Sequence, residues 1–170
     1  MQKLFRIILS LSLVSSLLLQ SCGYKLTQGN IPAEMKTISV QFFENNAPLV
    51  VPYLSQQFTE ALKDRIRTRS RLSVIRNEGD GSFSGRISDY SIRPVAIQGN
   101  ERAGLNRLTI TVLVKYTNNL KPEDNFEQSF TRYKDFSVAQ NSLQAQEPGL
   151  ITDVTQQLTE DIFNRAFANW

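Results

Sequence analysis

The sequence predicts an α/β fold, a two-layer sandwich in which two helices pack on one face of a mixed, mostly antiparallel sheet of four to five strands. Three observations predict it. A short alternating strand, an amphipathic helix and a second short strand follow one another between residues 36 and 76. Three long strand-like segments follow between residues 82 and 136, and a second amphipathic helix closes the chain. Each helix has one apolar face, which needs a sheet to cover it.

The first unit opens with Ile38, Val40 and Phe42, which alternate with polar residues in the two-residue period of a strand with one buried face. After Pro52 comes an amphipathic helix with proline in its first turn, since apolar residues recur at spacings of three and four: Leu54, Phe58, Ala61, Leu62 and Ile66. A short strand follows at residues 72–76. A strand, a helix and a strand in close succession predict a right-handed crossover between parallel neighbours.

The three long segments predict an antiparallel meander. In the first, residues 82–95, the large apolar residues move from odd-numbered to even-numbered positions, which predicts a bulge or bend near Ser88 and Asp89. A polar, glycine-bounded loop at 98–104 leads into the second segment, where every other residue is large and apolar: Leu108, Ile110, Val112, Val114 and Tyr116. The third segment, 126–136, returns beside it.

The last part of the chain predicts a linker and a helix. Residues 137–146 are rich in Gln, Asn and Ser and lead to Pro148, where we expect the second amphipathic helix to begin. Its apolar residues follow helical spacing: Ile151, Val154, Leu158, Ile162 and Ala166. The whole folded domain is expected to span residues 36–170.

Residues 1–21 have the profile of a bacterial lipoprotein signal peptide. A short positive region precedes an apolar stretch that is shorter than the roughly 20 residues a membrane span needs. It ends in Leu19-Gln20-Ser21-Cys22, which resembles a lipobox. In proteins with a lipobox the cysteine thiol receives a diacylglyceryl group, cleavage occurs before it, and the new amino group is acylated. We therefore expect a mature chain anchored through Cys22, with residues 22–35 as a lipidated tether.

The alternative is an ordinary secreted protein in which Cys22 is a lone thiol. Cys22 is the only cysteine of the chain, so no intramolecular disulfide can form. An exposed unpaired thiol in an oxidising compartment invites dimerisation. A cysteine found at the cleavage point and nowhere else is better explained by lipidation.

Composition excludes most common catalytic chemistry. The chain has no histidine, and its one cysteine is expected to be acylated, so Ser-His-Asp and Cys-His catalysis and ordinary zinc sites are excluded. No phosphate-binding glycine loop occurs. Residues 1–21 carry two of the 19 basic residues, which leaves 17 against 16 acidic ones and argues against nucleic acid as a partner. We expect no enzyme activity, no metal, and no cofactor apart from the acyl chains on Cys22.

Two groups of charged residues leave alternatives open. Acidic residues that could serve acid–base chemistry or hold a hard cation are, on the simpler interpretation, solvated: Asp153, Glu160, Asp161, Glu123 and Asp124. A basic run that could hold phosphates is explained mostly by the helix dipole: Lys63, Arg65, Arg67, Arg69, Arg71 and Arg76.

Three further arginines lie on or beside the loop between two long strands, at one end of the predicted sheet: Arg93, Arg102 and Arg107. On one interpretation these arginines bind a ligand at the loop, and on the other they only keep the loop soluble and the edge strand unpaired. The sequence supports the two interpretations about equally. For the aromatic residues of the last strand and the C-terminus we expect core packing: Phe126, Phe130, Tyr133, Phe136 and Trp170.

Several segments, taken in order, resemble the lipopolysaccharide-assembly lipoprotein family LptE, most closely its Bacteroidota members. They are Cys22-Gly23-Tyr24-Lys25-Leu26, Ile31-Pro32, Lys36-Thr37-Ile38-Ser39-Val40, the helix at 54–66, Asn106-Arg107-Leu108-Thr109-Ile110-Thr111-Val112, and Asn164-Arg165-Ala166-Phe167-Ala168-Asn169-Trp170.

The resemblance implies an outer-membrane lipoprotein that faces the periplasm and plugs the lumen of the large β-barrel LptD. The pair forms the translocon that inserts lipopolysaccharide into the outer leaflet. It also implies two helices on a mixed sheet, and it makes Arg93, Arg102 and Arg107 candidate ligands of lipopolysaccharide phosphates. A second hypothesis is an accessory lipoprotein of an envelope ABC-type lipid transport system.

Overall fold

The computed structural model describes residues 31–95, 105–139 and 141–168 of the chain. In chain order the elements are β1 (Thr37–Val40), β2 (Glu44–Asn45), α2 (Leu54–Arg69), β3 (Ser73–Ile75), β4 (Gly81–Pro94), β5 (Leu105–Asn118), the 3-10 turn η1 (Pro122–Asp124), β6 (Phe126–Ser137) and α3 (Leu143–Phe167). Neither helix of the described part combines the length and the apolar character that a membrane span requires.

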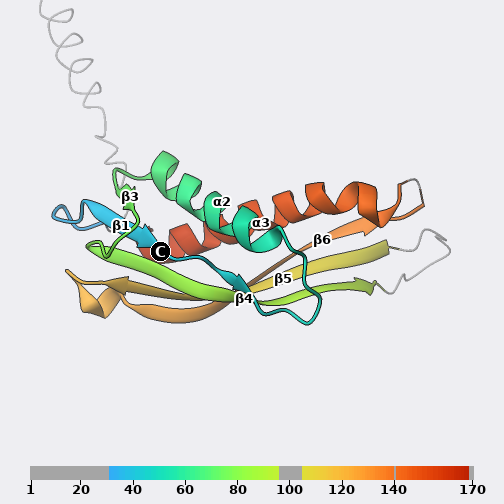
Figure 1. Ribbon diagram of the computed structural model, residues 1–170, viewed down its shortest axis with the longest axis horizontal. Coiled ribbons are helices and arrows are strands. Elements are labelled where there is room, and N and C mark those ends of the chain that lie inside the picture. Colours follow the sequence, from blue (N-terminus) through green and yellow to red (C-terminus); the bar gives the residue numbers. More distant parts are fainter. Residues whose placement is uncertain (1–30, 96–104, 140, 169–170) are drawn as a thin grey trace, which may run out of the picture.

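The elements form two layers, with α2 and α3 side by side over one face of a long twisted sheet (Figure 1). The strand order is β3-β1-β4-β5-β6, and the two-residue β2, which the sequence did not predict, also pairs with β4. The two antiparallel ladders, β4 with β5 and β5 with β6, run almost the full length of these strands. The parallel ladders of β1 and β2 span only two or three residues each. The predicted sandwich with a mixed, mostly antiparallel sheet is confirmed.

The meander and its bulge are also as predicted. The register of β4 against β5 shifts between Ile87 and Asp89, so Ser88 is the additional residue. Because successive residues of a strand point to opposite faces, one extra residue changes the side chains that point to the helices from odd-numbered to even-numbered positions. Ile87 before the bulge and Tyr90 after it are therefore both buried under the helices.

The first unit joins parallel neighbours, since β1 and β3 pair in parallel and α2 connects them. Two details differ from the prediction. Pro52 lies just before the helix, which starts at Leu54 with Tyr53 as its N-cap. β1 ends at Val40, so Phe42, expected on the buried face, has 59% of its surface exposed.

The second helix begins earlier than predicted, at Leu143, and Pro148 lies inside it. The expected linker is therefore shorter. The Ser142 hydroxyl caps the helix by accepting a bond from the Ala145 amide at 3.4 Å. Pro148 has no N–H, so the Gln144 carbonyl in the first turn of α3 loses its helical partner. The first turns of the helix carry polar residues, which hide them from a search for apolar periodicity.

A hydrogen bond to β4 also holds the first turns of α3. The Tyr90 hydroxyl donates to Glu147 Oε1 at 2.6 Å. Burial, together with this bond, raises the pKa of Tyr90 above its ordinary range.

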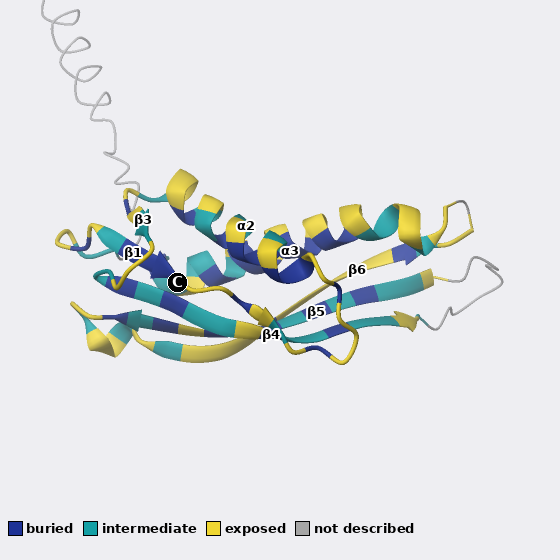
Figure 2. Ribbon diagram, in the orientation of Figure 1, coloured by how far each residue is buried: buried dark blue, intermediate teal, exposed yellow. Residues whose placement is uncertain are grey.

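The core lies between the two layers, where the dark-blue surfaces of helices and sheet face each other (Figure 2). Aromatic rings fill one end of it: Phe83, Tyr116 and Phe167 lie with ring centroids 4.9 to 6.0 Å apart. Met35, from the segment expected to be tether, is fully buried, and Ile31 packs against the core.

Gly85 is a point of close approach in β4. Its φ is +157°, and a Cβ there would lie 2.0 Å from the Leu113 carbonyl oxygen and 2.7 Å from Cε1 of Phe43. The ring of Phe43, packed on Phe58 with centroids 5.1 Å apart, fills the space above this glycine. A glycine is therefore required at this position.

Candidate functional site

The sheet face that points away from the helices, here called the open face, is polar. In the described part of the chain no helix covers it. Strand register places the following residues on it: Ser84, Arg86, Asp89, Ser91 and Arg93 from β4; Arg107, Thr109, Thr111, Leu113, Lys115 and Thr117 from β5; Glu127, Ser129, Thr131, Tyr133 and Asp135 from β6. Most have short hydroxyl or charged side chains, whereas the other parity of β5 is apolar and buried from Leu108 to Tyr116.

At one end of the open face, strand pairing puts three charged residues in one row. Arg93 of β4 lies opposite Arg107 of β5, and Arg107 lies opposite Asp135 of β6. Arg107 donates two hydrogen bonds to Asp135, from Nε to Oδ1 at 2.7 Å and from Nη2 to Oδ2 at 2.9 Å. These bonds raise the pKa of Arg107 and lower the pKa of the Asp135 carboxyl. The Arg107 guanidinium also lies 3.7 Å from the ring centroid of Tyr133.

Arg93 is exposed and, within the described residues, forms no ion pair. Like charges directly opposite on neighbouring strands repel each other. The structure thus brings Arg93 and Arg107 together, and we call them the arginine pair. The other two predicted site residues, Arg102 and Cys22, lie outside the described residues.

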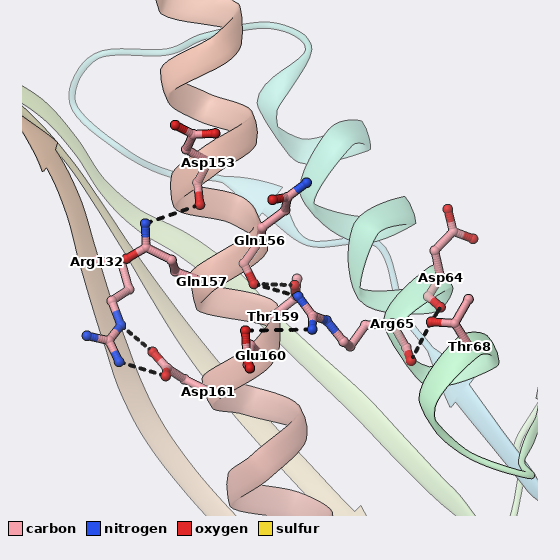
Figure 3. A network of polar contacts seen from close by, with 10 residues as sticks. All are labelled: Asp64, Arg65, Thr68, Arg132, Asp153, Gln156, Gln157, Thr159, Glu160 and Asp161. Carbon is pink, nitrogen blue, oxygen red and sulfur yellow. Dashed lines mark hydrogen bonds and ion pairs between the residues drawn. The ribbon is translucent and has the colours of Figure 1, made fainter. Parts of the chain in front are cut away.

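The acidic residues of the last helix are engaged in ion pairs. Arg132 of β6 holds Asp161, and Arg65 of α2 approaches Glu160 (Figure 3). The distances are 2.5 Å from Arg132 Nε to Asp161 Oδ2, 3.7 Å from Arg65 Nη1 to Glu160 Oε2, and 3.3 Å from Lys134 Nζ to Asp153 Oδ2. These pairs link α3 to β6 and to α2, and the short, two-bonded contact between Arg132 and Asp161 is the strongest of them.

The described residues also lack a cluster suited to a metal. No group of three or more His, Cys, Asp or Glu side chains there is placed to hold an ion. Of the other acidic pair, Asp124 binds Lys121 at 3.0 Å.

Most of the basic run is likewise used within the fold. Lys63 and Arg67 each pair, at 2.8 Å, with a carboxylate three residues earlier on α2. Arg65 donates to a backbone carbonyl of α3 at 2.9 Å. Arg71 donates to the carbonyl of Pro32 at 2.7 Å and so fastens the start of the described chain.

The prediction of core packing holds for three aromatic residues of β6 and is wrong for one. Phe130 and Phe136 are buried, and Phe126 packs against the core. Tyr133 has odd parity, lies on the open face and is 50% exposed. Phe126, Phe130 and Phe136 occupy even-numbered positions of β6, so the alternation along the strand is the sequence signal that separates Tyr133 from them. Trp170 lies outside the described residues.

Comparison with known proteins identifies the family. The sequence matches the family LptE, described as lipopolysaccharide-assembly, over residues 35–166. The chain belongs to the LptE family. The resemblance read from its sequence is therefore confirmed. No curated protein matches the sequence.

Several solved structures are similar to this LptE family member at low sequence identity. PelC from Paraburkholderia phytofirmans, solved as a dodecamer, aligns with a TM-score of 0.50 and 12% identity over 84% of this chain and 96% of that chain. The rare lipoprotein B from Shewanella oneidensis gives 0.49 and 12%, with 76% and 92% covered. A minor lipoprotein from Acinetobacter baumannii gives 0.48 and 17%, with 78% and 96% covered.

Proposed function

We propose that this protein is a lipoprotein of the outer membrane, facing the periplasm, that acts as plug and assembly factor of an LptD-type β-barrel. The barrel and its plug would form the translocon that inserts lipopolysaccharide into the outer leaflet. The observation that carries the proposal is membership of the lipopolysaccharide-assembly family over residues 35–166. The proposed role is non-enzymatic, because the protein fills and shapes a pore instead of transforming a substrate.

The chemistry of the open face supports a plug. Large outer-membrane barrels have a polar interior, so a domain enclosed by one must present polar surface to the wall. The open face carries hydroxyl and charged side chains, and the sides of α2 and α3 that point away from the sheet are exposed (Figure 2). Both sides of this elongated domain are therefore compatible with a wet, polar lumen.

Co-purification tests the partner. Outer membranes are dissolved in a mild detergent, and the protein is isolated with a photo-crosslinking amino acid at Thr109 or Ser129 of the open face. We expect a large β-barrel protein to co-purify and to be crosslinked. Absence of any such protein refutes the proposal. Crosslinking to a permease or substrate-binding subunit instead supports the accessory role in ABC-type lipid transport.

We further propose that the arginine pair, with Arg102, contacts lipopolysaccharide phosphates. Guanidinium groups bind phosphate oxygens through paired hydrogen bonds. Arg107 is already committed to Asp135, so Arg93 offers the more available donors. An anion between Arg93 and Arg107 would also relieve their repulsion.

Charge reversal tests this contact. Arg93→Glu, alone and combined with reversals at Arg102 and Arg107, is expected to weaken lipopolysaccharide binding and to reduce its salt dependence. Arg69→Glu, which changes an exposed arginine at the end of α2, is the control. Unchanged affinity in the triple variant removes all three arginines from the site.

The lipid anchor on Cys22 is the third part of the proposal. We expect Cys22→Ala to release the protein from the membrane without changing its melting temperature, since Cys22 precedes every element of the described core. Fractionation and thermal melting measure the two effects separately. A large loss of thermal stability would show that the tether is part of the fold.

A further inference from the structure

A cavity of about 630 Å³ lies along the flank of α2 at the β3 edge of the sheet, and we call it the edge cavity. Its lining includes four apolar residues, Val40, Phe42, Val74 and Ile75, and three basic ones, Lys63, Arg67 and Arg76. Its volume is within the range of about 300–1,000 Å³ that is typical of small-molecule sites.

The topology explains why a hollow forms here. β1 and β3 are parallel neighbours joined by α2, and crevices in such units open at the carboxyl ends of the strands. Val40 ends β1, and Arg76 directly follows β3. Because β3 is a three-residue edge strand, no further strand of the described sheet closes the cavity on that side.

The lining is apolar on the sheet side. Val40 and Val74 lie on the sheet face that the helices cover, where Val40 is buried and Val74 half-buried. Phe42 lies two residues beyond Val40 and has 59% of its surface exposed. The ring of Phe42 is therefore largely free of contacts within the domain, and it can pack against an apolar ligand in the cavity.

The opposite wall is cationic. Lys63 and Arg67 are four residues apart, so they lie on the same side of α2. Glu60 is the acidic residue among those that line the cavity, and it already pairs with Lys63 at 2.8 Å. Arg76 is exposed and has no ion pair within the described residues. Three basic groups and one acidic group give the lining a formal charge of +2, which falls to +1 when Asp64, the partner of Arg67 at 2.8 Å, is included. Arg76 carries the charge that no described carboxylate pairs with.

We propose that the edge cavity binds an anionic amphiphile. Its phosphate or carboxylate head lies against Arg76 and Arg67, and its apolar chain lies along Phe42 and Val74. The site differs from the arginine pair, which is on the other sheet face. Val40 pairs with Phe83 of β4, so ten residues of β4 separate this level from Arg93, or about 30 Å at the rise of a strand. The inference does not depend on the proposed plug function.

Calorimetric titration tests the site. The mature chain with Cys22→Ser, free of detergent, is titrated with decyl phosphate and decanoate below their micellar concentrations, and with inorganic phosphate and decyl maltoside. We expect an anionic amphiphile to bind at least about tenfold more tightly than inorganic phosphate or the neutral detergent, because head and chain both contribute. The stronger of the two anionic probes identifies the head group as phosphate or carboxylate.

Variants assign the binding to the edge cavity. Arg76→Gln and Phe42→Ser change exposed residues, so the fold is expected to survive, and each should weaken binding about tenfold. Arg69→Gln removes the same charge from α2 away from the cavity lining and should bind like the wild type. Wild-type affinity in both cavity variants, or equally tight binding of decyl maltoside, overturns the proposal.

Discussion

Replacing Gly85 by alanine should destabilise the protein strongly, because the new Cβ has no space. It would lie 2.0 Å from a carbonyl oxygen of Leu113, in the middle of the sheet, and 2.7 Å from the ring of fully buried Phe43. Neither neighbour is a flexible chain end, so β4 must separate from β5 locally or Phe43 must leave its place. Overpacking of this kind, added to an unfavourable positive φ, costs about 3 kcal/mol. For a domain of this size the melting temperature should fall by roughly 10 °C.

Gly149→Ala is the matched control. Gly149 lies in α3, and a Cβ there meets nothing within 4 Å. The same substitution should therefore stabilise the protein by about 0.5–1 kcal/mol through helix propensity. Circular dichroism during thermal and urea unfolding measures both variants. If Gly85→Ala melts at the wild-type temperature, the space above Gly85 is not filled as described, and the reasoning fails.

Three further predictions concern single polar groups. The Asp80 carboxylate accepts hydrogen bonds from the Lys36 and Thr37 amides at 2.9 Å, and these bonds lower its pKa. The charged carboxylate therefore stabilises the folded protein fully above the unfolded pKa of about 3.9, and this stabilisation is lost as the pH falls through the lower folded pKa. Asp80→Asn should melt below the wild type at pH 7, and the difference should shrink in acid; a difference independent of pH contradicts this. Thr59→Val should cost about 1–3 kcal/mol in urea unfolding, because the buried threonine hydroxyl accepts the Phe43 amide at 3.1 Å, and an unchanged midpoint would contradict it. Thr155→Val should instead stabilise by about 1 kcal/mol, since its buried hydroxyl has no partner among the described residues; a lower melting temperature would show that this hydroxyl is hydrogen-bonded.

Alternation of apolar residues was enough to predict the long strands and their bulge, because each faces the core on one side only. The same alternation does not show the residue at which a strand ends. Nothing in the alternation of Ile38, Val40 and Phe42 shows that β1 ends at Val40 and leaves Phe42 exposed. The start of α3 was hidden because its first turns are held by a cap and by polar contacts.

The candidate site was only partly accessible from sequence. The sequence shows that Arg93 and Arg107 flank one loop, but their pairing depends on the register of β4 against β5, which the bulge at Ser88 shifts by one residue. The bond from Arg107 to Asp135 joins residues 28 positions apart and likewise needs that register. The walls of a cavity are harder still to predict from sequence. Those of the edge cavity come from three elements that only the folded chain brings together.

The described chain enters the domain at one end of the sheet (Figure 1), where Arg71 holds the carbonyl of Pro32. The arginine pair lies toward the other end, near the last residue of β4 and the first of β5. Along β4, Gly81 to Arg93 covers twelve steps, or about 40 Å. A hydrocarbon layer is about 30 Å thick. The distance between the end where the described chain begins and the arginine pair therefore exceeds the hydrophobic thickness of a bilayer, so a partner that contacts both ends must itself extend at least that far.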